Sequence, residues 1–156
     1  MTVDPLGSFQ THGCPCDTFA EKNPELVKRL EHHVFRLHVG EAVEALRTRP
    51  SLQHGAGLNT HRRLFADFYP RVGQDCLAIL PHLAVGKAGR HDIFAHPQDI
   101  QRAVERCLSL DRDIMRPRPG EMMGLLACEH PCLGGDGRVP MAVHADLSRR
   151  TGIHVE

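Results

Sequence analysis

The sequence has no tryptophan and a single tyrosine, and aromatic residues make up only 4% of it. A core with so few rings has to be built mainly from Leu, Val, Ala and Met side chains. Few aromatic surfaces remain on which the bases of single-stranded nucleic acid can stack. We therefore expect a globular core, in keeping with 41% hydrophobic residues, and no nucleic-acid partner.

The sequence also lacks an excess of charge, a long apolar run and a secretory start. Nineteen basic residues balance nineteen acidic ones, so no long-range field favours DNA, a membrane or an acidic partner. No apolar stretch approaches the roughly 20 residues that span a bilayer, and the first residues are neither basic nor apolar. These absences predict a cytoplasmic protein with no membrane partner and with six reduced cysteines.

Length and periodicity predict one mainly α-helical domain behind an irregular arm. Residues 1–22 carry Pro, Gly, Ser and Thr without periodicity and form the arm, whereas residues 23–156 form the domain. Apolar spacing predicts helices over residues 23–48, 58–70, 97–108 and 122–129 and a last one that ends at Gly152. Asn23 is the expected N-cap, and Gly55 and Gly57 are expected in a turn. Between Cys76 and Phe94 the period changes, which predicts a short β-hairpin.

A glycine-rich loop before the last helix is the clearest sign of chemistry. The loop reads His130-Pro131-Cys132-Leu133-Gly134-Gly135-Asp136-Gly137-Arg138. Its glycines can adopt positive φ, which lets successive backbone N–H groups converge on an anion. The N-terminus of the following helix adds unpaired amides and a positive dipole end. A base beside a phosphate loop suggests phosphoryl or nucleotidyl transfer.

Two motifs in this order resemble those of the Fic domain, a helical bundle with a short β-hairpin flap. The family signature, His-x-Phe-x-(Asp/Glu)-Gly-Asn-Gly-Arg-x-x-Arg, aligns on His130. The upstream segment from His61 to Gly73 is similar to the family pattern H-x-x-L-F-x-D-x-Y-x-W-A-G. The residues from Leu83 to Phe94 are similar to the flap, which holds a target peptide over the site. The resemblance covers the chain from roughly Pro24 to Glu156.

The resemblance implies transfer of AMP from ATP, with Mg²⁺, to a Ser, Thr or Tyr hydroxyl of a target protein. His130 would be the general base that takes the hydroxyl proton. The residues that would bind the nucleotide are Gly134, Gly135, Asp136, Gly137 and Arg138. In the flap, Val85, Gly86 and Lys87 would contact the target.

The sequence departs from the signature where metal and phosphate are held. Gly134 replaces the Asp or Glu that anchors magnesium, and Met141 replaces the second arginine. Cys132 stands for the core Phe, and Asp136 for Asn. Since the loop contains no other acid, Asp136 is the candidate magnesium ligand. The chain ends soon after the signature helix, so the domain is expected to be truncated at its C-terminus.

Two other functions stay open. The first is a catalytically weak or inactive Fic-like domain that binds a nucleotide or a protein. The second is a small zinc-binding module with ligands from Cys14, Cys16, Cys128, His130 and Cys132, although the spacing fits zinc modules poorly. The inhibitory motif of many relatives, Ser/Thr-x-x-x-Glu-Gly/Asn, does not occur. Any restraint would therefore come from a separate antitoxin-like protein, as in a toxin–antitoxin pair, or be unnecessary.

Overall fold

The structure, a computed structural model, describes residues 23–82, 94–129, 132, 134–135 and 137–153. Within these residues it contains helices and no strand, which confirms the mainly α-helical class. The elements are α2 (Pro24–Arg47), α3 (His54–Phe65), α4 (Cys76–Ile79), the 3₁₀ turn η1 (Pro97–Asp99), α5 (Ile100–Ser109), α6 (Asp111–Met115), α7 (Pro119–Glu129) and α8 (Arg138–Thr151).

Local signals fixed both ends of the helical domain. The Asn23 side chain accepts hydrogen bonds from the backbone N–H groups of Glu25 and Leu26, as expected of an N-cap. At the other end Gly152 has φ 73° and closes α8 in the left-handed conformation that favours glycine. The residue types at these two positions were therefore sufficient to predict the start of α2 and the end of α8.

One local prediction was wrong, and a second was wrong at its start. Gly55 and Gly57 lie inside α3, which begins at His54, because residues around them, such as Ala56 and Thr60, pack into the interior. The segment from Cys76 to Ile79, where the hairpin was expected to begin, forms the short helix α4 instead. The Asp75 carboxylate accepts a hydrogen bond from the N–H of Ala78 at 2.9 Å, which caps a helical turn. The remainder of the expected hairpin, residues 83–93, lies outside the described residues.

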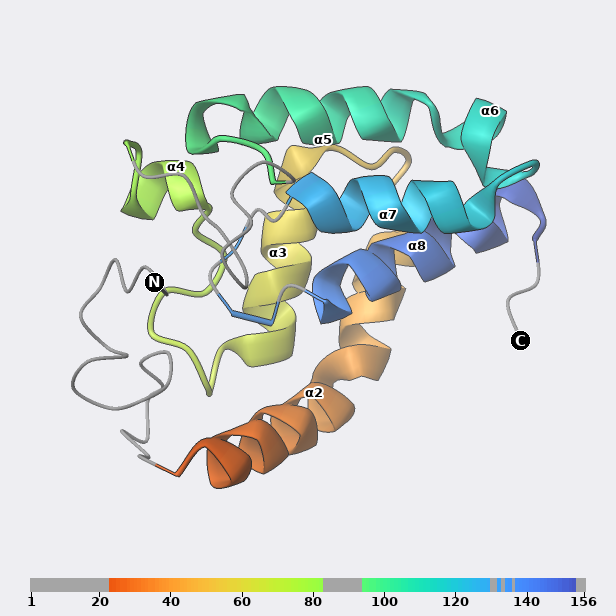
Figure 1. Cartoon of the computed structure of the whole chain (residues 1–156). Helices are drawn as coiled ribbons and strands as arrows, with labels where there is room; N and C mark the ends of the chain where they lie inside the picture. Colours follow the sequence, from red (N-terminus) through yellow and green to blue (C-terminus); the bar gives the residue numbers. More distant parts are fainter. Residues whose placement is uncertain (1–22, 83–93, 130–131, 133, 136, 154–156) are drawn as a thin grey trace.

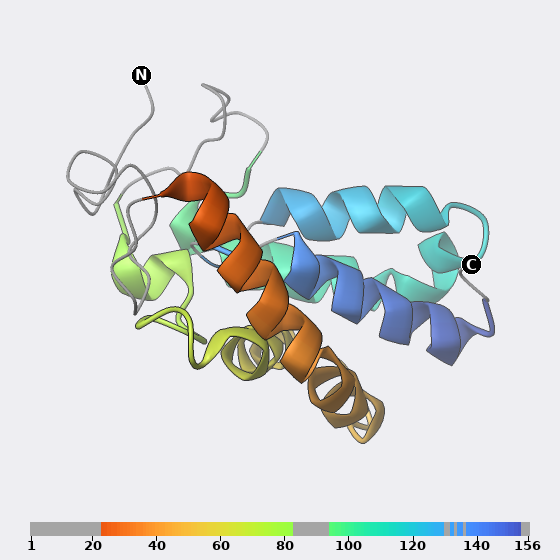
Figure 2. The same cartoon turned by 90° about the horizontal axis from the view of Figure 1, so that it is seen from below.

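The helices pack as a bundle in which α7 lies between α5 and α8 (Figure 1). The long helix α2 lies along α3 and also packs against α8 (Figures 1 and 2). No helix among the described residues is long and apolar enough to cross a membrane.

Among the described residues three apolar clusters form the core, and the two larger ones differ in composition. One joins α2, α3 and α5–α8 through aliphatic, Met and Cys side chains, including Leu46, Met115, Met122 and Leu147, as the composition predicted. The other contains the buried aromatic residues Phe65, Phe68 and Tyr69. Its aliphatic members are Val27, Val34, Ala42, Leu64 and Val139. The scarce rings are thus concentrated beneath the start of α8, where the glycine loop arrives.

A buried carboxylate ties α8 to the end of α2. Asp146 is fully buried and accepts hydrogen bonds from Arg149 at 2.9 Å and Arg150 at 2.6 Å. Arg150 in turn donates to the backbone carbonyls of Leu46 and Arg49 at 2.9 and 2.8 Å. These bonds attach α8 to the last turn of α2 and to the segment just beyond it, and they fix the register between α2 and α8.

Candidate functional site

The described part of the glycine loop has the positive-φ backbone conformation that we predicted from its glycines. Gly134 and Gly135 have φ values of 94° and 65°, in the region that L side chains rarely adopt. The Gly135 carbonyl accepts the N–H of Arg138 at 3.0 Å and of Val139 at 3.4 Å, which closes the first turn of α8. These two amides are therefore used within the turn, and the donors left for an anion are those of the loop itself.

The upstream motif forms the base on which this loop rests. His61 accepts a hydrogen bond at Nδ1 from the N–H of Gly73 at 3.0 Å, so the first and last residues of the motif are joined directly. Its ring packs against Phe65 and is stacked on Tyr69, with centroids 5.4 and 6.2 Å apart. A Cβ on Gly135 would overlap the Phe65 ring, whose Cζ would lie 2.8 Å away. The two motifs are therefore in contact.

Burial keeps His61 neutral. Loss of hydration lowers the pKa of His61 from 6.5 to about 4, and the backbone of Gly134 and the charge of Glu31 oppose this only partly. Because Nδ1 accepts a hydrogen bond, the proton of the neutral ring is on Nε2. His61 is thus a support of the loop and holds no titratable proton near neutral pH.

A carboxylate from α2 lies at the mouth of the loop. Oε1 of Glu31 is 2.9 Å from Nη1 of Arg138, and it accepts a hydrogen bond from the Tyr69 hydroxyl at 2.8 Å. The Arg138 guanidinium also lies over the rings of Phe35 and Phe65, at 5.5 and 5.9 Å from their centroids. One carboxylate oxygen therefore joins α2, the segment after α3 and the start of α8.

The described residues do not fit the magnesium ion that the resemblance implies. A Cβ on Gly134 would lie 2.8 Å from Cζ and 3.0 Å from Oη of Tyr69, so the place of the missing carboxylate is filled by a ring. Oε1 of Glu31 is already shared by Arg138 and Tyr69. The parts of the chain that the structure describes contain no group of three His, Cys, Asp or Glu side chains able to hold a metal.

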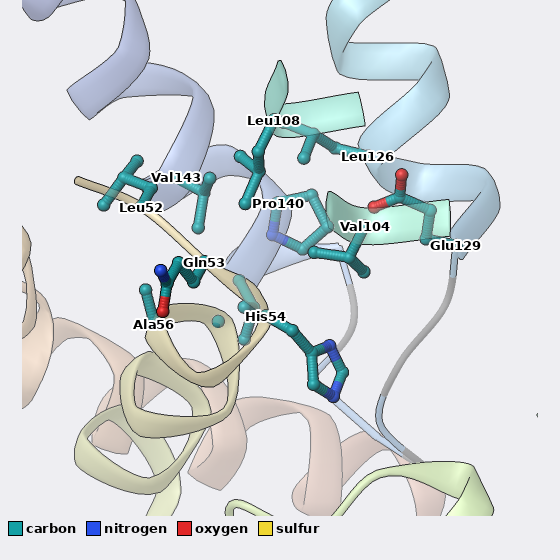
Figure 3. Close-up of a pocket in the computed structure, with 12 residues that line it drawn as sticks. Leu52, Gln53, His54, Ala56, Val104, Leu108, Leu126, Glu129, Pro140 and Val143 are labelled. Carbon is teal, nitrogen blue, oxygen red and sulfur yellow. The ribbon is translucent and has the colours of Figure 1, made fainter. Parts of the chain in front are cut away.

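A small hollow lies beside the loop, between the start of α3, α5, α7 and the first turn of α8 (Figure 3). Its volume of about 30 Å³ has room for about two waters and none for a nucleotide. Glu129, the last residue of α7, lines it and is 6% exposed. Burial raises the pKa of Glu129 to about 7, although a hydrogen bond with Cys107 opposes the rise. A carboxyl group that titrates near neutral pH thus lies next to His130 in the sequence.

Four of the nine predicted site residues fall within the described part of the chain. Gly134, Gly135, Gly137 and Arg138 meet at the start of α8. Met141, one turn further on, is 58% exposed. The predicted base His130, the metal candidate Asp136 and the flap residues Val85, Gly86 and Lys87 lie outside the described residues, so their roles stay predictions.

Sequence reasoning missed the role of Glu31. The signal that points to it is its position four residues after Val27 and three before Val34, both buried. A charged residue in the apolar stripe of a helix is buried only when it is paired. Pattern alone predicts a partner for Glu31, but it does not identify Arg138 or Tyr69.

The zinc interpretation finds no support among the described cysteines. Cys128 is exposed and Cys132 is buried, whereas Cys14 and Cys16 lie outside the described residues. Cys76 and Cys107 are buried thiols. Burial raises the pKa of Cys107 to about 12, which keeps it a thiol rather than a metal-binding thiolate.

Comparisons with known proteins show which fold this is. No protein-family model matches the sequence, and no curated protein is similar to it. The crystal structure of BepC, a VirB-translocated effector protein of Bartonella tribocorum with bound AMPPNP, matches with a TM-score of 0.67 and 14% identity over 88% of this chain and 73% of that one. The N-terminal Fic domain of a Bartonella effector protein from Bartonella sp. AR 15-3 matches with a TM-score of 0.62 and 16% identity, over 88% and 68% of the two chains. The chain therefore has a Fic-like fold, as its two motifs predicted.

Proposed function

We propose that this chain binds a nucleotide through the glycine loop and the first turn of α8. The observation that carries the proposal is the conformation of Gly134 and Gly135, which have positive φ and lie so close to the rings of Tyr69 and Phe65 that neither position has room for a Cβ. A rigid glycine loop at a helix N-terminus is a general solution for phosphate recognition. The bound AMPPNP of BepC, which has the same fold, supports a nucleotide as the phosphate carrier.

Arg138 is the side chain expected to contact the phosphate. The contact with Glu31 is made through Nη1, and the side chain is 22% exposed, so a ligand at the mouth of the loop can reach the guanidinium. The two Phe rings limit its movement and present it at the mouth of the loop. A phosphate in the loop would therefore meet a preoriented arginine.

Titration of the full chain with a fluorescent ATP analogue tests the proposal. Wild-type protein is expected to bind, and Arg138→Gln is expected to weaken binding by about tenfold, the usual loss for a charged hydrogen bond. Arg102→Gln is the matched control, because Arg102 also forms an ion pair near the start of its helix but is 82% exposed on α5. Equal affinity of wild type and Arg138→Gln at unchanged thermal stability would exclude the assigned role.

Transfer of AMP to a protein hydroxyl is the second candidate function. The order of the sequence favours it, because His130, a possible general base for a target hydroxyl, directly follows α7 and directly precedes the loop. The partner would be a target protein with a Ser, Thr or Tyr hydroxyl, and an antitoxin-like protein would be a further partner. Incubation with labelled ATP, magnesium and cell lysate is expected to label protein only while His130 is intact. Equal labelling by His130→Ala would rule out His130 as the base.

A further inference from the structure

The direction of the Arg138 side chain is set by groups from other helices. Its guanidinium lies over the rings of Phe35 and Phe65 and forms an ion pair with Glu31, whose Oε1 is 2.9 Å from Nη1. The Arg138 and Glu31 side chains are 22% and 16% exposed, so water screens their attraction only in part. The carboxylate of Glu31 therefore decides how much of the guanidinium an incoming anion can use.

The Tyr69 hydroxyl controls the position of this carboxylate. It donates to Oε1 of Glu31 at 2.8 Å, and this is the same oxygen that faces Arg138. The Tyr69 ring is only 7% exposed. It packs edge-on against Phe68 and Phe65, with centroids 4.7 and 5.6 Å apart, and is stacked on His61 at 6.2 Å. A ring held on several sides presents its hydroxyl in a fixed place, so it anchors Oε1 of Glu31.

Without this anchor the carboxylate would be free to turn toward the guanidinium. The strongest contact between a carboxylate and an arginine is the bidentate one, in which two oxygens face two N–H groups. A Glu31 side chain that lost its bond to Tyr69 gains most by forming that contact with Arg138. The guanidinium would then have fewer N–H groups left for an anion, and the anion would have to break a stronger pair.

We propose that Tyr69 is a positioning residue for Arg138, because its hydroxyl holds Glu31 and thereby keeps the guanidinium available to an anionic ligand. This inference rests on the proposed nucleotide binding and adds a residue that controls it. Tyr69 acts through Glu31 and does not itself have to touch the ligand. The change Tyr69→Phe tests this role cleanly, since it removes the hydroxyl but keeps the ring and the charge of the protein.

The first test is titration of the full chain with a fluorescent ATP analogue. Tyr69→Phe is expected to weaken binding by at least about threefold in the wild-type background and by less than about twofold in the Glu31→Gln background, where a neutral amide cannot form the charged bidentate contact. Thr60→Val is the matched control, because it also removes a buried hydroxyl, one that donates to the backbone carbonyl of Ala56 at 2.9 Å. Its affinity is expected to stay within about twofold of wild type.

The double variant separates positioning from a general loss of structure. If Tyr69→Phe weakens binding equally with Glu31 and with Gln at position 31, the hydroxyl does not act through the carboxylate and the inference is overturned. Unchanged affinity of Tyr69→Phe in the wild-type background would overturn it as well. If the wild-type chain does not bind the analogue, the proposed nucleotide binding fails and the inference fails with it.

A second measurement needs neither a nucleotide nor a change at Tyr69. The sequence has one tyrosine and no tryptophan, so the intrinsic fluorescence of the protein comes from Tyr69. Tyrosine emission is quenched when the hydroxyl donates to a carboxylate, so Glu31→Gln is expected to increase it. Glu41→Gln, on the same helix but paired with Arg63 at 2.6 Å, is expected to leave it unchanged. Equal emission of wild type and Glu31→Gln would overturn the inference and leave the proposed nucleotide binding intact.

Discussion

Replacing Gly135 by alanine is the sharpest test of the loop geometry. The φ of 65° costs an L residue about 1 kcal/mol relative to glycine. The new Cβ would overlap the ring of Phe65, which is fully buried in α3 and can move only by disturbing Tyr69 and His61. Overpacking of this kind costs about 1–3 kcal/mol. We therefore expect Gly135→Ala to lower the free energy of unfolding by about 2–4 kcal/mol, measured by urea denaturation followed by circular dichroism.

The control is a glycine that needs no special backbone. Gly124 lies in α7 with no atom within 4 Å of an added Cβ, and its φ is not positive. Gly124→Ala is expected to raise the free energy of unfolding by about 0.5–1 kcal/mol, because alanine favours the helix over glycine. The reasoning fails if Gly135→Ala is as stable as wild type, since the added Cβ would then not clash with the Phe65 ring.

Three further predictions concern buried charge and the metal position. The pKa of Glu129 is raised from 4.5 to about 7, so the folded state keeps a proton that the unfolded state releases, and the free energy of unfolding should fall by about 2–3 kcal/mol between these pH values; urea titrations at pH 5, 6 and 7.5 should show this fall in wild type and not in Glu129→Gln. Asp146→Asn should lower the free energy of unfolding by about 2 kcal/mol, because two arginines lose their buried partner; an unchanged melting temperature would contradict the tie between α2 and α8. Gly134→Asp should destabilise the protein by about 2 kcal/mol and create no magnesium affinity in calorimetry, because the Tyr69 ring fills the site; tight magnesium binding by this variant would show that the ring yields.

Much of the fold could be predicted because its signals are local. The Asn23 cap, the Gly152 terminus and the 3.6-residue apolar period each involve residues within one or two turns of each other. Prediction failed where packing overrode propensity. Gly55 and Gly57 are weak helix formers, yet they lie in α3 because neighbouring residues of that helix pack into the bundle.

The amino-acid sequence by itself determined the helical class, the two motifs and the glycine loop, because each depends on residue type and spacing along the chain. Only the tertiary structure decided what surrounds the loop. Glu31, Tyr69 and Arg138 are far apart in the sequence and come from α2, the segment after α3 and α8, and their meeting depends on how α2 and α3 pack against α8. The sequence showed that a carboxylate was missing at Gly134. The packing showed that a ring takes its place and that Arg138 pairs with an acid from α2, since a largely buried charge is stable only with a partner.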